Sequence, residues 1–469
     1  AYRAIFRVER NNASDDEGCC SLVQNLWRAA LGGADALVTW TLQEAGYPGA
    51  HSAVAQTMEL RQRLNRIRGK KPAGSTLAAA PARPAAEEAE TDLAQFLGGE
   101  WKQDESGRTF RVERSMPCDL IHGRLRLDEI YRTDVRWLEL LSGDPEFSTF
   151  DPEATLFLDT ETTGLAGGSG TYVFLVGLGY FRGDVFRTDQ LFLPDLDSEF
   201  SFLKQLCDRV RGDADGKTFR YLVTFNGKGY DLNLLEYRFL IHGIEPPFES
   251  LSHLDLLYPT RMLWKRSLQN CALQTVEKLI LGLRRPPDIP SALIPRTYFT
   301  YLRSGEHQPF QSVFEHNRID VLTMVGLLAV AVQLLKEPDR RFFVSPISSA
   351  QMLLLRGEDQ EALRLLEIVS QETQWEVERP DLMLLLAGLK KKLGASDEAL
   401  ALFEELLRIQ ERPPLETFEE AAKILEHQKR DLGKALSLVQ KASSMYPESN
   451  DLNHRKFRLQ CRIAGEKWY

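Results

Sequence analysis

Two carboxylates at the end of a predicted buried strand are the residues of this chain best suited to chemistry. Asp159 and Glu161 follow the apolar run 156–158 and precede a Thr-Thr-Gly turn signal. Because strand side chains alternate between two faces, Asp159 and Glu161 project from the same face. Neighbouring carboxylates repel, and their burial without a partner is costly, so a hard divalent cation is the usual solution. The pattern favours a metal site over its alternative, a surface strand with two solvated acids.

A predicted helix near residue 320 carries a second pair of reactive side chains. His316 and Asp320 are four positions apart and therefore share one helix face. The residues after Asp320, 321–328, are strongly apolar, so Asp320 opens a buried face, an unusual place for a charge without a partner. A histidine beside an acid at this spacing is either a catalytic group or an ordinary packed residue, and both interpretations stay open.

Three further polar residues follow predicted strand ends. Asp231 comes after a Gly-rich turn and falls in the first turn of a helix, where an acid also suits the helix dipole. Asn226, at the strand end, is either a ligand-contacting or a turn residue. Asp255 lies at a later strand, and we favour its pairing with the basic residues that follow over a role in metal binding.

The elements that must position these side chains alternate between strand and helix across residues 151–338. We expect strands at 155–159, 171–180, 185–193, 221–225 and 253–258, and helices at 197–211, 229–242, 272–281 and 311–336. Three early strands followed by strand–helix alternation predict the α/β class, with a mixed sheet flanked by helices.

The flanking regions have different compositions. We expect a helical or partly ordered region at 1–69, an Ala/Pro-rich flexible linker at 70–91, the α/β domain with an N-terminal elaboration at 92–340, and an all-α domain at 345–469. In the last region Ala362, Ala399 and Ala435 recur at near-equal spacing in similar segments. This pattern resembles tetratricopeptide repeats, with a generic array of helical hairpins as the alternative.

Composition limits the partners and the compartment. The net charge of −9 over 469 residues argues against nucleic-acid binding by a generally basic surface but leaves room for a local basic groove. Residues 261–285 are such a basic window, either a phosphate-contacting surface or a solvated helix face. The six cysteines form no Cys-x-x-Cys pair, which fits free thiols in a reducing cytoplasm. With no apolar run of about 18 residues, no membrane span is expected.

The order of the acids carries a specific resemblance. Asp159 with Glu161, then Asp231, then Asp320, resemble the four acids of the DEDD exonucleases of the ribonuclease H-like superfamily. The chain closely resembles the bacterial YprB-like branch, whose members typically end in helical repeats. The resemblance covers residues 95–340 well and the C-terminal repeats more weakly.

This resemblance implies a ribonuclease H-like fold and a metal-dependent 3′–5′ exonuclease. Two Mg²⁺ or Mn²⁺ ions would be held by the four acids, and His316 would act as general base. The histidine stands at the spacing of the tyrosine-type branch, which leaves the base assignment open. By the same analogy the residues that contact the terminal nucleotide are Thr162, Thr163, Gly164 and Leu165.

The expected substrate is single-stranded DNA or RNA, or its 3′ end. Asn226, Arg261, Lys265 and Arg266 are further candidates for nucleic-acid contact, and the C-terminal repeats are a candidate surface for a protein partner. Two alternatives remain: a catalytically inactive nucleic-acid-binding scaffold, and a structure-selective endonuclease of the same superfamily. A pure repeat adaptor would leave residues 151–338 unexplained.

Overall fold

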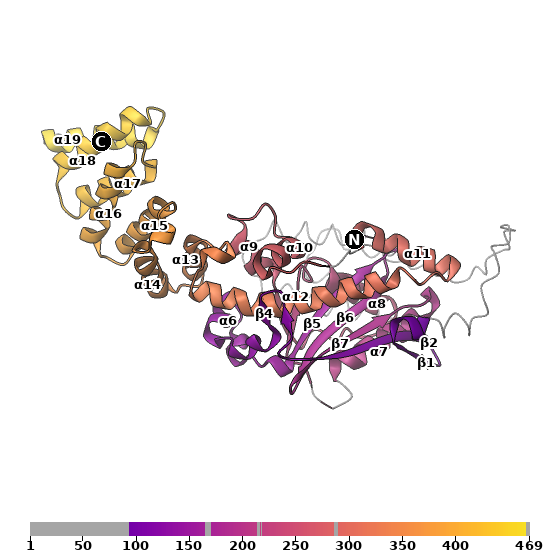
Figure 1. The fold of residues 1–469 in the computed structure, drawn as a ribbon. Coiled ribbons are helices and arrows are strands. Elements are labelled where there is room, and N and C mark those ends of the chain that lie inside the picture. The colour runs from indigo at the N-terminus through magenta and orange to yellow at the C-terminus, as the bar shows by residue number, and fades with distance from the viewer. Residues whose placement is uncertain (1–92, 165–169, 213–215, 217, 286–288, 466–469) are drawn as a thin grey trace, which may run out of the picture. The chain divides into compact units, whose positions relative to one another are not determined.

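The computed structural model describes residues 93–164, 170–212, 216, 218–285 and 289–465, all within the unit that spans residues 83–469. The predicted N-terminal region at 1–69 and linker at 70–91 lie outside these residues. The described part contains a mixed seven-stranded sheet with helices on both faces, followed by an all-helical region (Figure 1). The predicted fold class is therefore confirmed.

The seven strands run in the order β1-β2-β7-β6-β5-β8-β9. Their bounds are Glu100–Asp104 (β1), Gly107–Pro117 (β2), Thr155–Thr162 (β5), Val173–Arg182 (β6), Val185–Phe192 (β7), Tyr221–Thr224 (β8) and Ser252–Asp255 (β9). The strands β5, β8 and β9 are parallel, whereas β1, β2, β7, β6 and β5 pair antiparallel. A separate two-stranded ribbon joins β3 (Ile121–His122) and β4 (Leu125–Arg126).

Helices pack against both faces of this sheet. They are α6 (Val135–Ser142), α7 (Glu199–Arg211), α8 (Asp231–Ile241), α9 (Leu257–Trp264), α10 (Leu273–Val276), α11 (Ile294–Ser304) and α12 (Phe310–Lys336). A π-helical turn, Glu277–Leu281, extends α10. The predicted strand at 253–258 was too long, because β9 ends at Asp255 and a helix begins at Leu257; α9 and α11 were not predicted.

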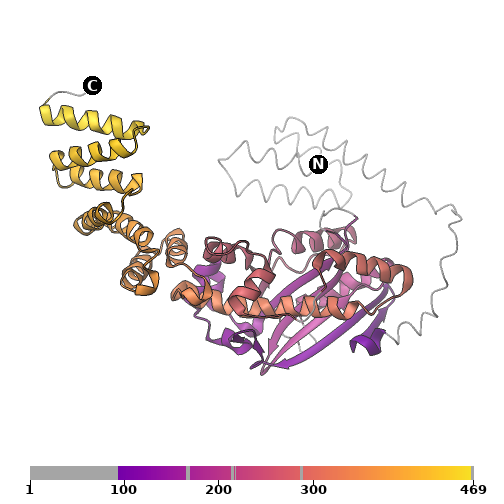
Figure 2. The ribbon, with the colours of Figure 1, turned by 45° about the horizontal axis from the view of Figure 1, so that its top comes forward.

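Two hydrophobic clusters form the core on opposite faces of the sheet. Along β5 the alternation of side chains sends Phe157 into one cluster and its neighbours Leu156 and Leu158 into the other. The helix α12 crosses β5, β6 and β7 and joins both clusters, with Phe314 in one and Val321 in the other (Figures 1 and 2). Its polar stretch, 315–320, therefore lies where the helix passes from one cluster to the other.

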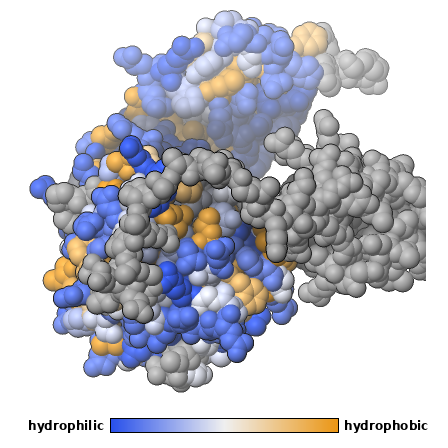
Figure 3. Space-filling view, turned by 90° about the vertical axis from the view of Figure 1, so that its right-hand side faces the viewer, coloured by the Kyte–Doolittle hydropathy of each residue, from blue (hydrophilic) through white to orange (hydrophobic). Residues whose placement is uncertain are grey.

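The helix α12 is the one described helix that is long and apolar enough to cross a membrane by length and composition. Because 78% of its most apolar window is buried inside the protein, it has the character of a core helix. On the face shown in Figure 3, hydrophilic side chains cover most of the described surface and apolar side chains occupy small separate areas.

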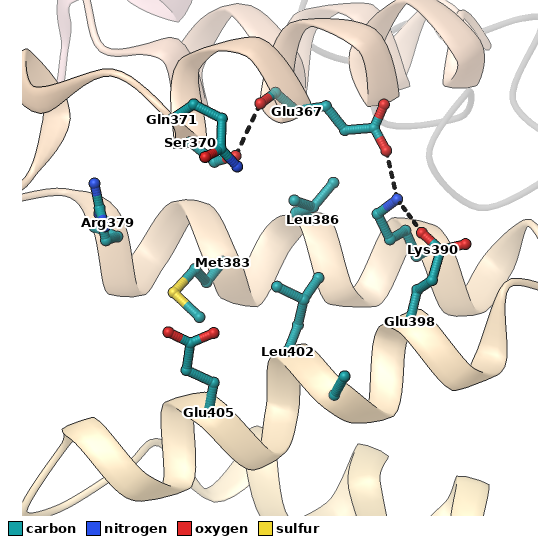
Figure 4. Close-up of a pocket in the computed structure, with 11 residues that line it drawn as sticks. Glu367, Ser370, Gln371, Arg379, Met383, Leu386, Lys390, Glu398, Leu402 and Glu405 are labelled. Atoms are coloured by element: carbon teal, nitrogen blue, oxygen red, sulfur yellow. Dashed lines mark hydrogen bonds and ion pairs between the residues drawn. The ribbon is translucent and has the colours of Figure 1, made fainter.

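The C-terminal region is a series of helices in which sequence neighbours pack on each other. They are α13 (Pro346–Leu355), α14 (Asp359–Ser370), α15 (Arg379–Lys392), α16 (Ser396–Ile409), α17 (Leu415–His427), α18 (Leu432–Met445) and α19 (Asn450–Ala464). The recurring alanines Ala362, Ala399 and Ala435 are fully buried, as close packing of paired helices requires. A pocket of about 580 Å³ lies between α14, α15 and α16 (Figure 4).

Candidate active site

The four predicted acids come from three elements, of which one is an interior strand of the sheet and two are helices. Asp159 and Glu161 lie on β5, Asp231 is the first residue of α8, and Asp320 lies in α12. The pKa of Asp159 is raised well above its usual value, first by burial and then by the charges of Asp320, Glu161 and Asp231. The structure thus brings together the acids that the sequence separates by up to 161 positions.

One oxygen of Asp159 is held by a chain of buried amides. The Asn317 side-chain nitrogen donates to Asp159 Oδ2 over 2.8 Å, and Asn317 Oδ1 accepts from Gln190 Nε2 over 2.8 Å. The same Gln190 nitrogen donates to the Phe314 carbonyl oxygen. Because a carbonyl can only accept, the direction of every bond in this chain is fixed, and Asp159 Oδ2 must accept as well. The amide chain therefore favours the ionised form of Asp159 and opposes the upward shift of its pKa.

The fit around Asn317 is tight. Its side chain is fully buried, and a Cβ atom at Gly177 of β6 would lie 2.1 Å from Asn317 Oδ1. A residue with any side chain at position 177 would displace the amide. The glycine and the asparagine together fix the position of Asp159 Oδ2.

Asp231 is held in position by a hydrogen bond from a threonine of β5. Thr160 Oγ1 donates a hydrogen bond to Asp231 Oδ1. Burial raises the pKa of Asp231 to about 6, while the Thr160 hydroxyl lowers it. The charges of Asp255 and Asp320 raise this pKa further. Ionisation of the buried Asp231 carboxyl therefore costs free energy, and a bound cation would offset this cost.

Asp320 is paired with a buried arginine. Arg285 donates to Asp320 Oδ1 and, through two nitrogens, to Glu277 over 2.8 and 2.6 Å. Thr323 Oγ1 also donates to Glu277 over 3.0 Å, which holds that carboxylate. Burial raises the pKa of Asp320, whereas Arg285 and His316 oppose this shift.

The buried His316 ring is engaged on both nitrogens. Arg285 Nη1 lies 3.3 Å from His316 Nδ1, and His316 Nε2 lies 3.5 Å from Asp320 Oδ2. Because a guanidinium can only donate, Nδ1 must be the acceptor, and the proton of the neutral ring is on Nε2, facing Asp320. In this arrangement His316 can accept a further proton only after Arg285 releases Nδ1.

The turn after β5 is fixed by a tyrosine. The Tyr230 hydroxyl lies 2.9 Å from Thr162 Oγ1 and donates to the Gly164 carbonyl oxygen. Thr163 Oγ1 accepts from the Tyr172 backbone N–H over 2.9 Å. These bonds shape the predicted nucleotide-contacting residues Thr162, Thr163 and Gly164; the fourth, Leu165, lies outside the described residues.

Asn226 and Asp255 form one turn. Asp255 is buried and accepts from the backbone N–H groups of Asn226 (2.7 Å), Lys228 (3.0 Å) and Leu257 (3.0 Å). The expected pairing of Asp255 with the basic window was therefore wrong. Asn226 is exposed and has a φ of 68°, a left-handed conformation that asparagine tolerates in turns.

The predicted basic residues lie at the surface. Arg261, on α9, and Lys265 and Arg266, just after it, are all exposed. Arg266 Nη2 lies 3.8 Å from Asp381 of α15, at exposures where such an ion pair contributes little. These side chains are accessible to an anionic ligand.

The donor set suits hard divalent cations. Among the described residues no three His, Cys, Asp or Glu side chains form a preassembled cage. Instead, an amide, a hydroxyl and a guanidinium hold Asp159, Asp231 and Asp320. One nearby arginine cannot balance four carboxylates, and Arg285 is already shared with Glu277. Carboxylate oxygens are the preferred ligands of Mg²⁺ and Mn²⁺, so the residues present fit such ions.

Several residues of this site were missed from the sequence. Asn317 stands between the two predicted side chains of α12, and Gln190 follows the polar residues 187–189 of β7, from which no local pattern distinguishes it. Arg285 belongs to the predicted basic window, but nothing in a local pattern distinguishes it from its solvated neighbours. The one available signal was Gly177, an interior strand glycine, which commonly marks a close approach.

Comparison with known proteins gives two matches. The model of the RNase_H superfamily matches residues 156–332. The chain is 30% identical over 337 residues to the uncharacterized protein YprB of Bacillus subtilis (strain 168), covering 71% of this chain and 79% of that protein. The first match spans β5 to α12, and hence all four acids.

Proposed function

Because the chain belongs to the ribonuclease H superfamily, as a relative of YprB, we propose that it is a metal-dependent 3′–5′ exonuclease acting on single-stranded nucleic acid. The superfamily supports a nuclease fold and a nucleic-acid substrate. The polarity of cleavage, the preference for single strands and the two-metal mechanism belong to the proposal.

The observation that carries the proposal is the mutual effect of the four carboxylates. Asp320, Glu161 and Asp231 each raise the pKa of Asp159, and burial raises the pKa of all three buried aspartates. Such an arrangement is unfavourable in a purely structural role and suits a site that gains cations. Asp159, Glu161, Asp231 and Asp320 are the proposed ligands.

The four acids would hold divalent cations, which when bound would supply Lewis-acid stabilisation of charge in phosphodiester hydrolysis. The chain's own residues have positioning roles: Asn317 fixes Asp159, and Thr160 fixes Asp231. His316 is the proposed general base, and its proton acceptor is Nδ1 once Arg285 turns away. Arg285, turned away from His316, is a proposed contact for a substrate phosphate.

The proposed substrate contacts are Thr162, Thr163, Gly164 and Leu165 at the 3′ terminal nucleotide, with Asn226, Arg261, Lys265 and Arg266 along the strand. The four described cysteines are free thiols, which supports the proposed cytoplasmic location. A protein partner of the C-terminal helices, and their assignment as tetratricopeptide repeats, remain predictions.

The test is cleavage of 5′-labelled single-stranded DNA and RNA in Mg²⁺ or Mn²⁺, alongside a covalently closed circle. The wild type should give a ladder shortening from the 3′ end, which Asp159→Asn abolishes. Glu315→Gln is the matched control, because Glu315 lies on α12 but pairs with Arg318 outside the carboxylates. Cutting of the circle would favour the endonuclease, and intact binding without cleavage of any substrate would favour the inactive scaffold.

A further inference from the structure

Three arginines of the last helix converge on one carboxylate. Glu426, near the end of α17, is fully buried and accepts from Arg455 (3.3 Å), Arg458 (2.6 and 2.8 Å) and Arg462 (2.6 Å) of α19. The arginines stand at i, i+3 and i+7 of α19 and therefore share one face. We refer to Glu426 and these arginines as the arginine cluster.

The arginine cluster contains more positive charge than is needed to balance its carboxylate. A single guanidinium balances one carboxylate, so two positive charges remain uncompensated within the cluster. The exposed fraction of the side chains increases along α19, from 17% for Arg455 to 26% for Arg458 and 43% for Arg462. Within the described part of the chain, Arg458 Nε is buried and has no acceptor. The guanidinium that is most accessible to solvent is therefore that of Arg462, near the C-terminal end of α19.

An ion cluster elsewhere in the same helical region has the opposite composition. Lys390 of α15 lies between Glu367 of α14 (hydrogen-bonded) and Glu398 of α16 at 2.7 Å, two acids around one cation (Figure 4). Helix packing in this region therefore does not require a surplus of arginine. The helix α19 also carries Lys456 and has a single acid, Asp451, in a chain whose net charge is −9.

We propose that the arginine cluster is a second nucleic-acid contact, which binds backbone phosphates of a single strand away from the cleavage site. Guanidinium groups hold phosphate oxygens through paired N–H donors, and seven helical positions span about 10 Å, enough for successive phosphates. The proposal rests on the proposed function for its choice of ligand. It explains how an acidic protein gains affinity for an anionic polymer through one localised surface.

The experiment measures binding of a fluorescein-labelled single-stranded 20-mer, as DNA and as RNA, to the full-length Asp159→Asn protein over a range of salt concentrations. Arg462→Gln is the test variant, because Arg455 and Arg458 still hold Glu426 in its absence. Lys456→Gln is a second variant, since Lys456 does not contact Glu426. The matched control is Arg408→Gln on α16, whose side chain is 77% exposed and lies 3.9 Å from Glu405.

Loss of one phosphate contact should reduce the slope of log K against log salt by about 0.7, which corresponds to about 4-fold weaker binding near 0.15 M salt. We expect this for Arg462→Gln and not for Arg408→Gln. Wild-type affinity and slope in Arg462→Gln would overturn the proposal, whatever the result for Lys456→Gln. Arg462-dependent binding of polyglutamate, without binding of the oligonucleotide, would also overturn it. Arg462-dependent binding, together with a wild-type protein that cleaves no substrate in Mg²⁺ or Mn²⁺, would leave this inference intact and refute the proposed function.

Discussion

Replacing Asn317 tests whether the amide chain positions Asp159 for metal binding. Asn317→Leu keeps the branched shape and the number of heavy atoms but removes both the donor to Asp159 Oδ2 and the acceptor for Gln190 Nε2. A hydrogen bond to a charged group is worth about 1.5–3 kcal/mol, equivalent to about 10- to 150-fold in an equilibrium constant. Mutation of a residue that orients a metal ligand typically lowers the affinity for the metal by about 10- to 100-fold. We therefore expect Mn²⁺ affinity to fall by about 10- to 100-fold.

The assay is calorimetric titration of the metal-free protein with Mn²⁺, which does not depend on turnover. Gln205→Leu on α7 is the control, since Gln205 accepts a 2.7 Å hydrogen bond from Thr109 away from the site. A folded Asn317→Leu protein with wild-type Mn²⁺ affinity would refute the reasoning.

Three further predictions follow from the same geometry. The pKa of Asp231 is about 6 in the folded protein and ordinarily near 3.8. The contribution of Asp231 to stability is therefore fully present below about pH 4 and is lost as the pH rises through about 6. Thermal melts of the metal-free protein should show this decline, and Asp231→Asn should flatten it. Arg285→Ala removes the arginine partner of the buried carboxylates Glu277 and Asp320 and should lower the free energy of unfolding by about 3–5 kcal/mol. Mn²⁺ should raise the melting temperature of this variant more than that of the wild type. An equal rise in both proteins would count against metal binding at Asp320. Tyr230→Phe should cost about 1 kcal/mol of stability and raise KM for the oligonucleotide with kcat little changed, whereas the exposed Tyr237→Phe should alter neither.

Local signals in the sequence were sufficient to predict β5 and α12. The apolar run before Asp159 identifies β5, and the apolar stretch after Asp320 identifies the buried face of α12. The order of the acids then identifies the superfamily, which the match over residues 156–332 confirms.

The parts of the structure that the sequence did not predict depend on side-chain contacts that have no signature in the sequence pattern. The end of β9 was misplaced because the Asp255 carboxylate accepts the Leu257 N–H and turns the chain into α9. Asn317 and Gln190 are 127 positions apart, and only the crossing of α12 over β7 brings them together. Arg285 is buried by contacts with Glu277 and Asp320 that no spacing rule indicates.

The most direct test of the account is anomalous diffraction from crystals of the protein soaked in Mn²⁺. The account predicts two anomalous peaks about 3.5–4 Å apart, bounded by Asp159, Glu161, Asp231 and Asp320, with Arg285 moved from Asp320. Asp159→Asn should lose at least one of these peaks. Crystals in which Mn²⁺ binds elsewhere, or not at all, while Arg285 stays paired with Asp320 would contradict the assignment of this site as a two-metal nuclease centre.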